Sequence, residues 1–202
     1  FIFRTDSSFD QDLGRHIKLG EIITQTWQIP KTNLFSYTNP DFPFINTHWL
    51  FEVIAYFFRE NLQILLILKV IIFLFSTWLV FKIVPQDKRV FLLPIGFIFL
   101  HVLRERLELR PEIFSFLFTA TTYYILEKCL KSKTRLIYLL PIIQFLWINT
   151  HIYFFVGLIL QTIFLITNRK IKLLWLIFGV SIFVSLINPN GISVFLYPLS
   201  VT

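Results

Sequence analysis

A charged cluster near the start of the chain contains the residues best suited to chemistry. Asp10 and Asp12 stand close to Arg15 and His16, in a stretch whose apolar spacing predicts a helix over residues 10–26. On that helix, Asp12 and His16 lie four residues apart and therefore on one face. These carboxylates could act as a general base or hold a divalent cation. The alternative is a solvated helix start that is capped by an aspartate.

A second charged cluster lies in the middle of the chain, where three arginines alternate with three glutamates between residues 104 and 112. The guanidinium groups of Arg104, Arg106 and Arg110 match phosphate oxygens in a bidentate way. Arg110 directly precedes Pro111, at a predicted helix start where free backbone N–H groups also favour anions. The pattern indicates a phosphate clamp, and the alternative is a self-neutralising loop between two helices.

The elements that must position these side chains are strongly apolar. Of the 202 residues, 55% are hydrophobic, 25 are phenylalanine and only 15% are charged. A soluble domain of this size could not bury so much apolar surface, so we expect the bilayer to be its solvent. The net charge of +7 would suit nucleic acid in a soluble protein. Here its distribution indicates a membrane topology, and no nucleic acid partner is expected.

The apolar stretches predict an all-α membrane protein in two parts. Residues 1–61 form a large outer loop with one helix over 10–26 and another over 45–58, and the second lies in or dips into the membrane interface. Its proline-rich segment is predicted to be ordered by its aromatic residues. Residues 62–202 form a transmembrane bundle of about six spans and the start of another. The predicted spans cover residues 62–84, 90–103, 111–127, 136–148, 152–167 and 173–187, and another begins at residue 192. Since the chain has no methionine, we expect a fragment of a longer protein.

Basic residues in alternate loops predict the orientation of this bundle. Three loops hold ten of the nineteen lysines and arginines and only two acids: Lys82, Lys88, Arg89, Lys128, Lys131, Lys133, Arg135, Arg169, Lys170 and Lys172, with Asp87 and Glu127. The positive-inside rule places these loops in the cytoplasm. The outer face then receives residues 4–60, 104–112, 149–151 and 188–191. Trp78 and Trp175 are predicted in one aromatic belt, and Trp49 and Trp147 in the other.

Two further residues are candidates for an outward-facing site. Lys69 lies about two turns inside an apolar stretch, where a charge is costly, so it is predicted to face the bundle interior or a polar cavity. Snorkelling toward the interface is the alternative. His151 lies between Trp147 and Tyr153, and it is a candidate for the site or an interfacial histidine. Asn188-Pro-Asn-Gly191 is more typical of an ordinary turn.

Several short motifs occur in order along nearly the whole chain. They are Asp10-Gln-Asp-Leu-Gly-Arg-His16, Gly20-Glu-Ile, Pro30, Phe35-Ser-Tyr-Thr38, His48-Trp-Leu-Phe-Glu52, Arg110-Pro111, Trp147-Ile-Asn-Thr-His151 and Asn188-Pro-Asn-Gly191. Together they resemble the GT-C class of polytopic membrane glycosyltransferases, which includes relatives of protein mannosyltransferases and oligosaccharyltransferase catalytic subunits. The pattern Asp12-Leu-Gly-Arg-His16 is similar to the Asp-x-x-x-His pattern in the first loop of the latter.

The resemblance implies an inverting glycosyltransferase of the cell envelope, with its active site on the outer side of the membrane. Its donor would be a sugar on a polyprenyl-phosphate carrier, and its acceptor a glycan, lipid or protein. Asp12, then Asp10, would act as base or hold a divalent cation, with His16 beside them. The other implied residues bind substrate: His48, Glu52, Lys69, Arg104, Arg106, Arg110 and His151.

Two alternatives from other classes share the predicted membrane topology. The first is a polytopic transporter, whose outer charges would line a permeation entrance. The second is a lipid-linked sugar polymerase or ligase, which shares the substrates but need not share the acids of the outer loop. The absence of an internal repeat, and Lys69 as the one clearly intramembrane charge, favour the transferase over the transporter.

Overall fold

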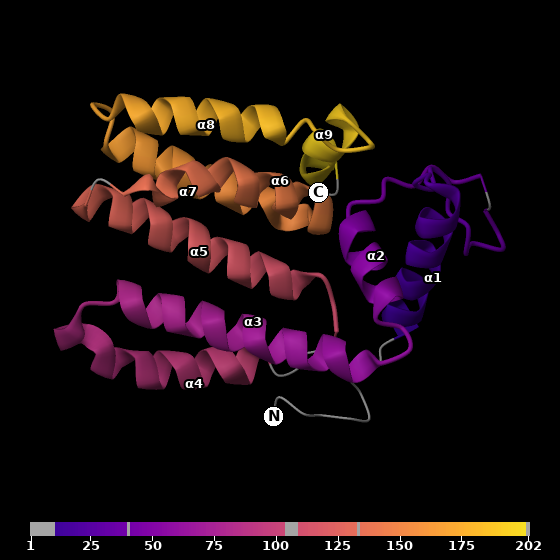
Figure 1. The fold of residues 1–202 in the computed structure, drawn as a ribbon, viewed down its shortest axis with the longest axis horizontal. Helices are drawn as coiled ribbons and strands as arrows, with labels where there is room; N and C mark the ends of the chain where they lie inside the picture. The colour runs from indigo at the N-terminus through magenta and orange to yellow at the C-terminus, as the bar shows by residue number, and fades with distance from the viewer. Residues whose placement is uncertain (1–10, 40, 104–108, 133, 201–202) are drawn as a thin grey trace.

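The computed structural model describes residues 11–39, 41–103, 109–132 and 134–200, and within these ranges it is built of helices (Figure 1). The α-helices are α1 (Gln11–Thr26), α2 (Trp49–Phe57), α3 (Leu62–Ile83), α4 (Leu92–Leu103), α5 (Glu112–Lys131), α6 (Leu140–Thr150), α7 (Phe155–Thr167), α8 (Lys172–Val184) and α9 (Ile192–Ser200). Short 3-10 helices are η1 (Gln86–Phe91), η3 (Arg135–Leu139) and η4 (Ile152–Phe154). The described part of the chain contains no strand, which confirms the predicted all-α class.

The helices form two groups that run in different directions (Figure 1). Helices α3 to α8 lie side by side along the long axis of the molecule, whereas α1 and α2 run across one end of them (Figure 1). Within the bundle, α5 contacts α3, α6 and α7, and α8 contacts α6 and α7. Helix α2 packs against α1 on one side and α6 on the other. We refer to α1 and α2 as the crosswise layer.

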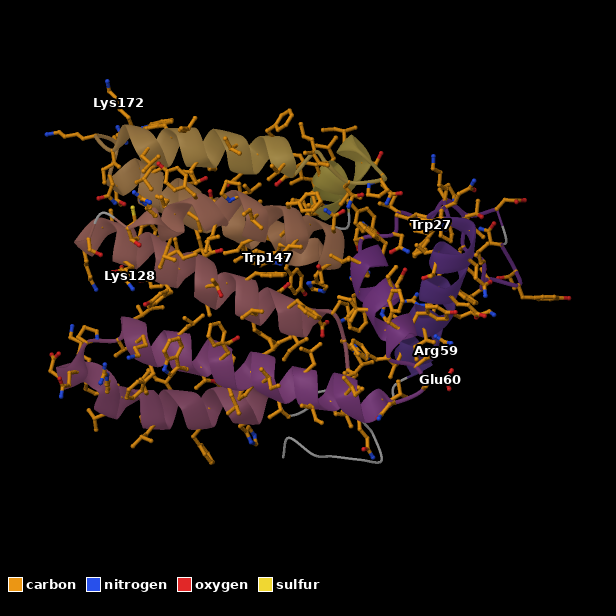
Figure 2. The ribbon with its side chains drawn as sticks, in the orientation of Figure 1. Trp27, Arg59, Glu60, Lys128, Trp147 and Lys172 are labelled. Atoms are coloured by element: carbon orange, nitrogen blue, oxygen red, sulfur yellow. The ribbon has the colours of Figure 1, made fainter. Side chains whose placement is uncertain are left out.

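The basic loops of the bundle gather at one of its ends. The α3–α4, α5–α6 and α7–α8 connections lie at one end, where Lys128 and Lys172 are found (Figure 2). Arg59, Glu60 and Trp27 lie at the opposite end, with the crosswise layer (Figure 2). The three basic loops predicted to share one side therefore lie together. Their cytoplasmic orientation stays a prediction.

Helix α3 is more polar on its buried face than on its exposed face. Its buried residues are Leu65, Lys69, Ile72, Ser76 and Leu79. Its exposed large side chains are Ile64, Ile67, Ile71, Leu74, Phe75, Trp78, Val80 and Phe81. A helix at a water interface shows the opposite pattern. Lys69 is 4% exposed, so the prediction that it faces the interior is confirmed.

Among the described residues, α3 is the helix that is long and apolar enough to cross a membrane by itself. Residues 135–150, 152–167 and 172–184 form shorter apolar helices. Their boundaries agree closely with the predicted apolar stretches, because charged or other polar residues flank each stretch. The arrangement of about six spans stays a prediction.

One of the two tryptophans predicted at the outer interface, Trp147, is fully buried. Trp147 is 0% exposed and packs in a core cluster with Phe118 and Phe154, so its assignment to an aromatic belt was wrong. Its indole N–H is satisfied inside the protein instead, by a serine described below. Trp78 and Trp175, in contrast, are exposed on α3 and α8, and their place in an aromatic belt stays a prediction.

The segment between α1 and α2 differs from its predicted form. Its aromatic residues were expected to order it, but Phe35, Tyr37 and Phe42 are exposed. Backbone hydrogen bonds order it instead, from the amide of Asn33 to the Phe42 carbonyl (3.0 Å) and from that of Phe44 to the Lys31 carbonyl (2.8 Å). Helix α2 begins at Trp49, and residues 45–48 precede it without helical structure.

The crosswise layer depends on one glycine. A Cβ atom added at Gly20 would overlap the backbone carbonyl of Glu52 and meet Cβ of Tyr56 at 2.8 Å. A side chain at this position would therefore force α1 and α2 apart. Gly14 lies on the same helix, and a Cβ atom added there has no atom within 4 Å.

Gly20→Ala is expected to lower the free energy of unfolding by roughly 2 kcal/mol or more, because the backbones cannot stay in contact. Gly14→Ala, the matched control, should raise it by up to about 1 kcal/mol through helix propensity alone. Thermal unfolding in detergent measures both. Equal effects of the two substitutions would contradict the close packing at Gly20.

Candidate functional site

Three histidines from distant parts of the chain meet where the crosswise layer joins the bundle. His16 comes from α1, His48 directly precedes α2, and His151 forms the turn between α6 and η4. The ring centroids of His16 and His48 are 5.8 Å apart, and those of His48 and His151 are 5.2 Å apart. We call these three residues the histidine cluster. The sequence predicted that these three histidines lie on the same side of the membrane. The fold brings His48 into contact with both of the others.

Each ring of the histidine cluster has a hydrogen-bond partner at Nδ1. The partners are Glu52 Oε1 for His16 (3.3 Å), Thr47 Oγ1 for His48 (3.1 Å) and Ser115 Oγ for His151 (2.8 Å). A carboxylate accepts, so His16 donates to Glu52. Ser115 Oγ also accepts from Trp147 Nε1 at 2.8 Å. These partners hold the orientation of all three rings.

Glu52 is the most enclosed charged group near the cluster, with an exposed fraction of 1%. Its second carboxylate oxygen, Oε2, accepts from Asn46 Nδ2 at 2.6 Å. The carbonyl of Asn46 in turn accepts from Asn190 Nδ2 at 3.1 Å. The carboxylate therefore joins α1 to the segment before α2, and that segment is joined to the turn before α9.

A second polar network holds the turn at residues 188–191 against the end of α6. Asn149 Oδ1 accepts from Trp49 Nε1 (2.8 Å) and from Asn188 Nδ2 (3.0 Å). Asn188 also donates to the carbonyl of Ile148. The sequence pattern alone suggested an ordinary turn here. In the structure, the turn also fastens the crosswise layer to the bundle.

Burial keeps two of the histidines neutral. It lowers the pKa of His151 from 6.5 to about 4, with a smaller contribution from nearby His16. Burial also lowers the pKa of His48 well below its usual value, helped by His151, His16 and Arg15. A desolvated imidazole disfavours its charged form. At neutral pH these two rings therefore act as neutral hydrogen-bonding groups and not as cations for a phosphate.

Asp12 lies at the solvent-accessible rim of the crosswise layer. Its side chain is 45% exposed, and its two oxygens lie 3.6 Å from Arg15 Nη2 and 3.8 Å from Arg110 Nη2. Arg110 belongs to the segment that leads into α5, so this contact spans the crosswise layer and the bundle. Asp12 is thus an accessible carboxylate between two guanidinium groups.

Comparisons of the chain with protein-family models, with curated proteins and with solved structures give no match.

Asp12 and His16 lie four residues apart on α1, as predicted, but their side chains contact different groups. Among the described residues, His16 bonds to Glu52 and Asp12 bonds to arginines, although both lie on α1. Glu52 was predicted to bind substrate, but its burial and its two hydrogen bonds give it an internal role. Lys69 is buried in α3 and lies on the inner face of the bundle.

Three of the predicted site residues, Asp10, Arg104 and Arg106, lie outside the described residues. Within the described residues, no group of three histidine, cysteine, aspartate or glutamate side chains could hold a metal ion. The predicted divalent cation therefore has no ligand set in this part of the chain.

Sequence reasoning missed the neutral partners of the site, namely Asn46, Thr47 and Ser115. Ser115 is buried in an otherwise apolar stretch of α5. A lone hydroxyl in such a stretch needs a hydrogen-bond partner. This need could have marked Ser115 as a candidate site residue. Asn46 gave no such signal. Its hydrogen bond to Glu52 depends on where α2 begins, which is at Trp49 and not at residue 45 as predicted.

Proposed function

We propose that this chain is part of a polytopic membrane glycosyltransferase, which transfers a sugar from a polyprenyl-phosphate carrier to an acceptor on the outer side of the membrane. The observation that carries the proposal is the placement of Asp12. It is an accessible carboxylate beside Arg110, at the junction between a helix that crosses the bundle end and the bundle itself. The ordered motifs that resemble GT-C enzymes supply the reaction class.

The membrane part of the proposal is supported by the distribution of apolar side chains. Large apolar residues are exposed along α3, α4 and α8, including Phe75, Phe97 and Phe183. Polar residues such as Ser76 and Ser181 are buried. A bundle with these faces is suited to hydrocarbon, where helix surfaces need no polar groups. The basic loops gathered at one end support an outer-leaflet position for the crosswise layer, by the positive-inside rule.

The crosswise layer then lies parallel to the membrane plane, because its helices run across the bundle (Figure 1). A lipid-linked donor in the outer leaflet would approach the site from the bundle side, and a soluble acceptor from the opposite side. Asp12 lies at the rim between the two. This position is suited to a reaction between a lipid-borne and a water-borne substrate.

The proposed chemical step uses one proton transfer and one substitution. Asp12 accepts the proton of an acceptor hydroxyl, and the resulting oxygen nucleophile attacks the anomeric carbon of the donor sugar. A new carbon–oxygen bond forms as the bond from that carbon to the carrier phosphate breaks, with inversion of configuration. Arg110 stabilises the negative charge that develops on the departing phosphate. Arg104 and Arg106 are expected to share this role.

The histidine cluster has a structural part in this proposal. Because His48 and His151 are neutral, they contribute hydrogen bonds to the junction and no attraction for phosphate. No step is assigned to a divalent cation, since the described residues offer no ligand set for one.

The test is sugar transfer in membranes that contain the full-length protein, supplied with labelled polyprenyl-phosphate sugars of several kinds. The proposal expects transfer from at least one donor, with release of the carrier phosphate in equal amount. Failure with every donor, from protein shown to be folded, would contradict the proposal and favour the transporter. Net flux of the donor across sealed vesicles would then be the expected observation.

A further inference from the structure

We infer that Glu52 is a positioning residue, which sets the place of the Asp12 carboxylate through His16. This inference rests on the proposed function, since it assigns Asp12 the role of base. Glu52 itself cannot meet a substrate, because it is 1% exposed and both of its carboxylate oxygens have partners inside the protein.

The contact between Glu52 and α1 is made at two neighbouring points. The side chain of Glu52 accepts from His16, and its backbone carbonyl packs against Gly20. His16 and Gly20 are four residues apart, so both lie on one face of α1. Two contacts on one face fix the rotation of the helix as well as its position along α2.

Asp12 lies one further turn toward the start of α1. A helix rises about 1.5 Å per residue, so the Cα atoms of Asp12 and His16 are roughly 6 Å apart along the axis. Leu13, between them, packs in a core cluster with Phe51 and Ala55 of α2. This short rigid segment passes any shift of His16 on to Asp12.

Among the residues that the structure describes, the Asp12 carboxylate has no equally firm contact of its own. Its contacts with Arg15 and Arg110 are 3.6 and 3.8 Å long, longer than a hydrogen bond between charged groups. Both contacts are solvent-accessible, and exposed ion pairs impose little order. The position of the carboxylate therefore depends on how α1 is held, and the enclosed hydrogen bond from His16 to Glu52 anchors α1 one turn away from it.

The other side of Glu52 is anchored as well. Asn46 donates to Oε2, and Asn190 holds the carbonyl of Asn46. A chain of hydrogen bonds thus runs from the turn before α9, through Asn46 and Glu52, to His16 on α1. These hydrogen bonds fix the position of the crosswise layer relative to the bundle. They therefore also fix Asp12 relative to Arg110, which lies in the segment leading into that bundle.

The test compares Glu52→Gln with wild type in the transfer assay on the full-length protein. Glutamine keeps the size of the side chain but offers one acceptor oxygen, so it cannot accept from both His16 and Asn46. The expected result is a fall in kcat of about 10- to 100-fold, because a displacement near 1 Å is enough for such a loss. The KM for the donor should stay within about twofold, since binding groups are untouched.

Two further variants keep the inference open to contradiction. Glu60→Gln, at a glutamate that is 82% exposed beside Arg59, should transfer at the wild-type rate. His16→Gln should reduce kcat as Glu52→Gln does, and the double variant should lose no more than either single one, because both break the same contact. If Glu52→Gln fails to fold, His16→Gln replaces it as the primary test.

Wild-type kcat in folded Glu52→Gln or His16→Gln, or a loss confined to KM, would overturn the inference. Additive losses in the double variant would overturn it too. The outcome is separate from that of the proposed function. If replacement of Asp12 stops transfer and Glu52→Gln does not, only the positioning role fails. If replacement of Asp12 leaves transfer intact, the role of Asp12 as base fails.

Discussion

Asp12→Asn is expected to lower the rate of sugar transfer by about 10²- to 10⁴-fold, the usual contribution of a positioned base. Asparagine has nearly the same shape, but its amide cannot accept the proton of the acceptor hydroxyl. Because Asp12 is 45% exposed and its ion pairs are long, the substitution should leave the thermal stability close to that of wild type. The measurement is the initial rate of transfer by full-length protein at equal amounts of folded enzyme.

The matched control for this prediction is Asp41→Asn. Asp41 is an exposed aspartate in the segment before α2, so its replacement removes the same charge from a neighbouring part of the chain. Transfer by this variant should equal wild type. Equal losses in both variants would indicate a general effect of charge, and full activity of Asp12→Asn would exclude it as the base.

The positions of the helices could be predicted because the sequence marks where each apolar stretch ends. Prolines and charged residues bound these stretches, and α3, α5 and α7 begin or end within a few residues of the predicted limits. The burial of Lys69 was predictable for the same reason, since an isolated charge in an apolar helix has few places to go.

The contacts of the site could not be predicted, because they join residues that are distant in sequence. The helical spacing of Asp12 and His16 suggested that they act together, and it placed both on one helix correctly. The partner of His16 is instead Glu52, 36 residues later in the chain. Only the packing of α1 on α2 at Gly20 brings these two side chains into contact. Sequence spacing shows which residues share a helix face but not what that face meets.

Trp147 illustrates the same limit for an aromatic residue. A tryptophan near the end of an apolar stretch is typical of a membrane interface, and Trp78 and Trp175 are exposed as an interface position would need. Trp147 differs because Ser115 supplies a partner for its N–H group inside the protein. Once that hydrogen bond is available, full burial of the indole becomes favourable.

The histidine cluster makes the junction between the crosswise layer and the bundle sensitive to acid. The pKa of His151 is about 4 in the folded protein and near 6.5 when the chain is unfolded. Between these values the unfolded state takes up a proton that the folded state does not. The contribution of neutral His151 to the free energy of unfolding is therefore fully present above about pH 7, and it is lost as the pH falls from 6.5 toward 4.

Lowering the pH from 7 to 4 is accordingly expected to remove about 3 kcal/mol of stability through His151 alone, at 1.36 kcal/mol for each unit of pKa difference. His48 acts in the same direction, because its pKa is also lowered by burial. The measurement is the thermal unfolding midpoint in neutral detergent at a series of pH values, for wild type and His151→Gln. The variant should lose less stability on acidification, whereas His101→Gln, at an exposed histidine of α4, should follow wild type. The same acid dependence in wild type and in His151→Gln would contradict the prediction, because the cost of protonating His151 would then be absent from the folded protein.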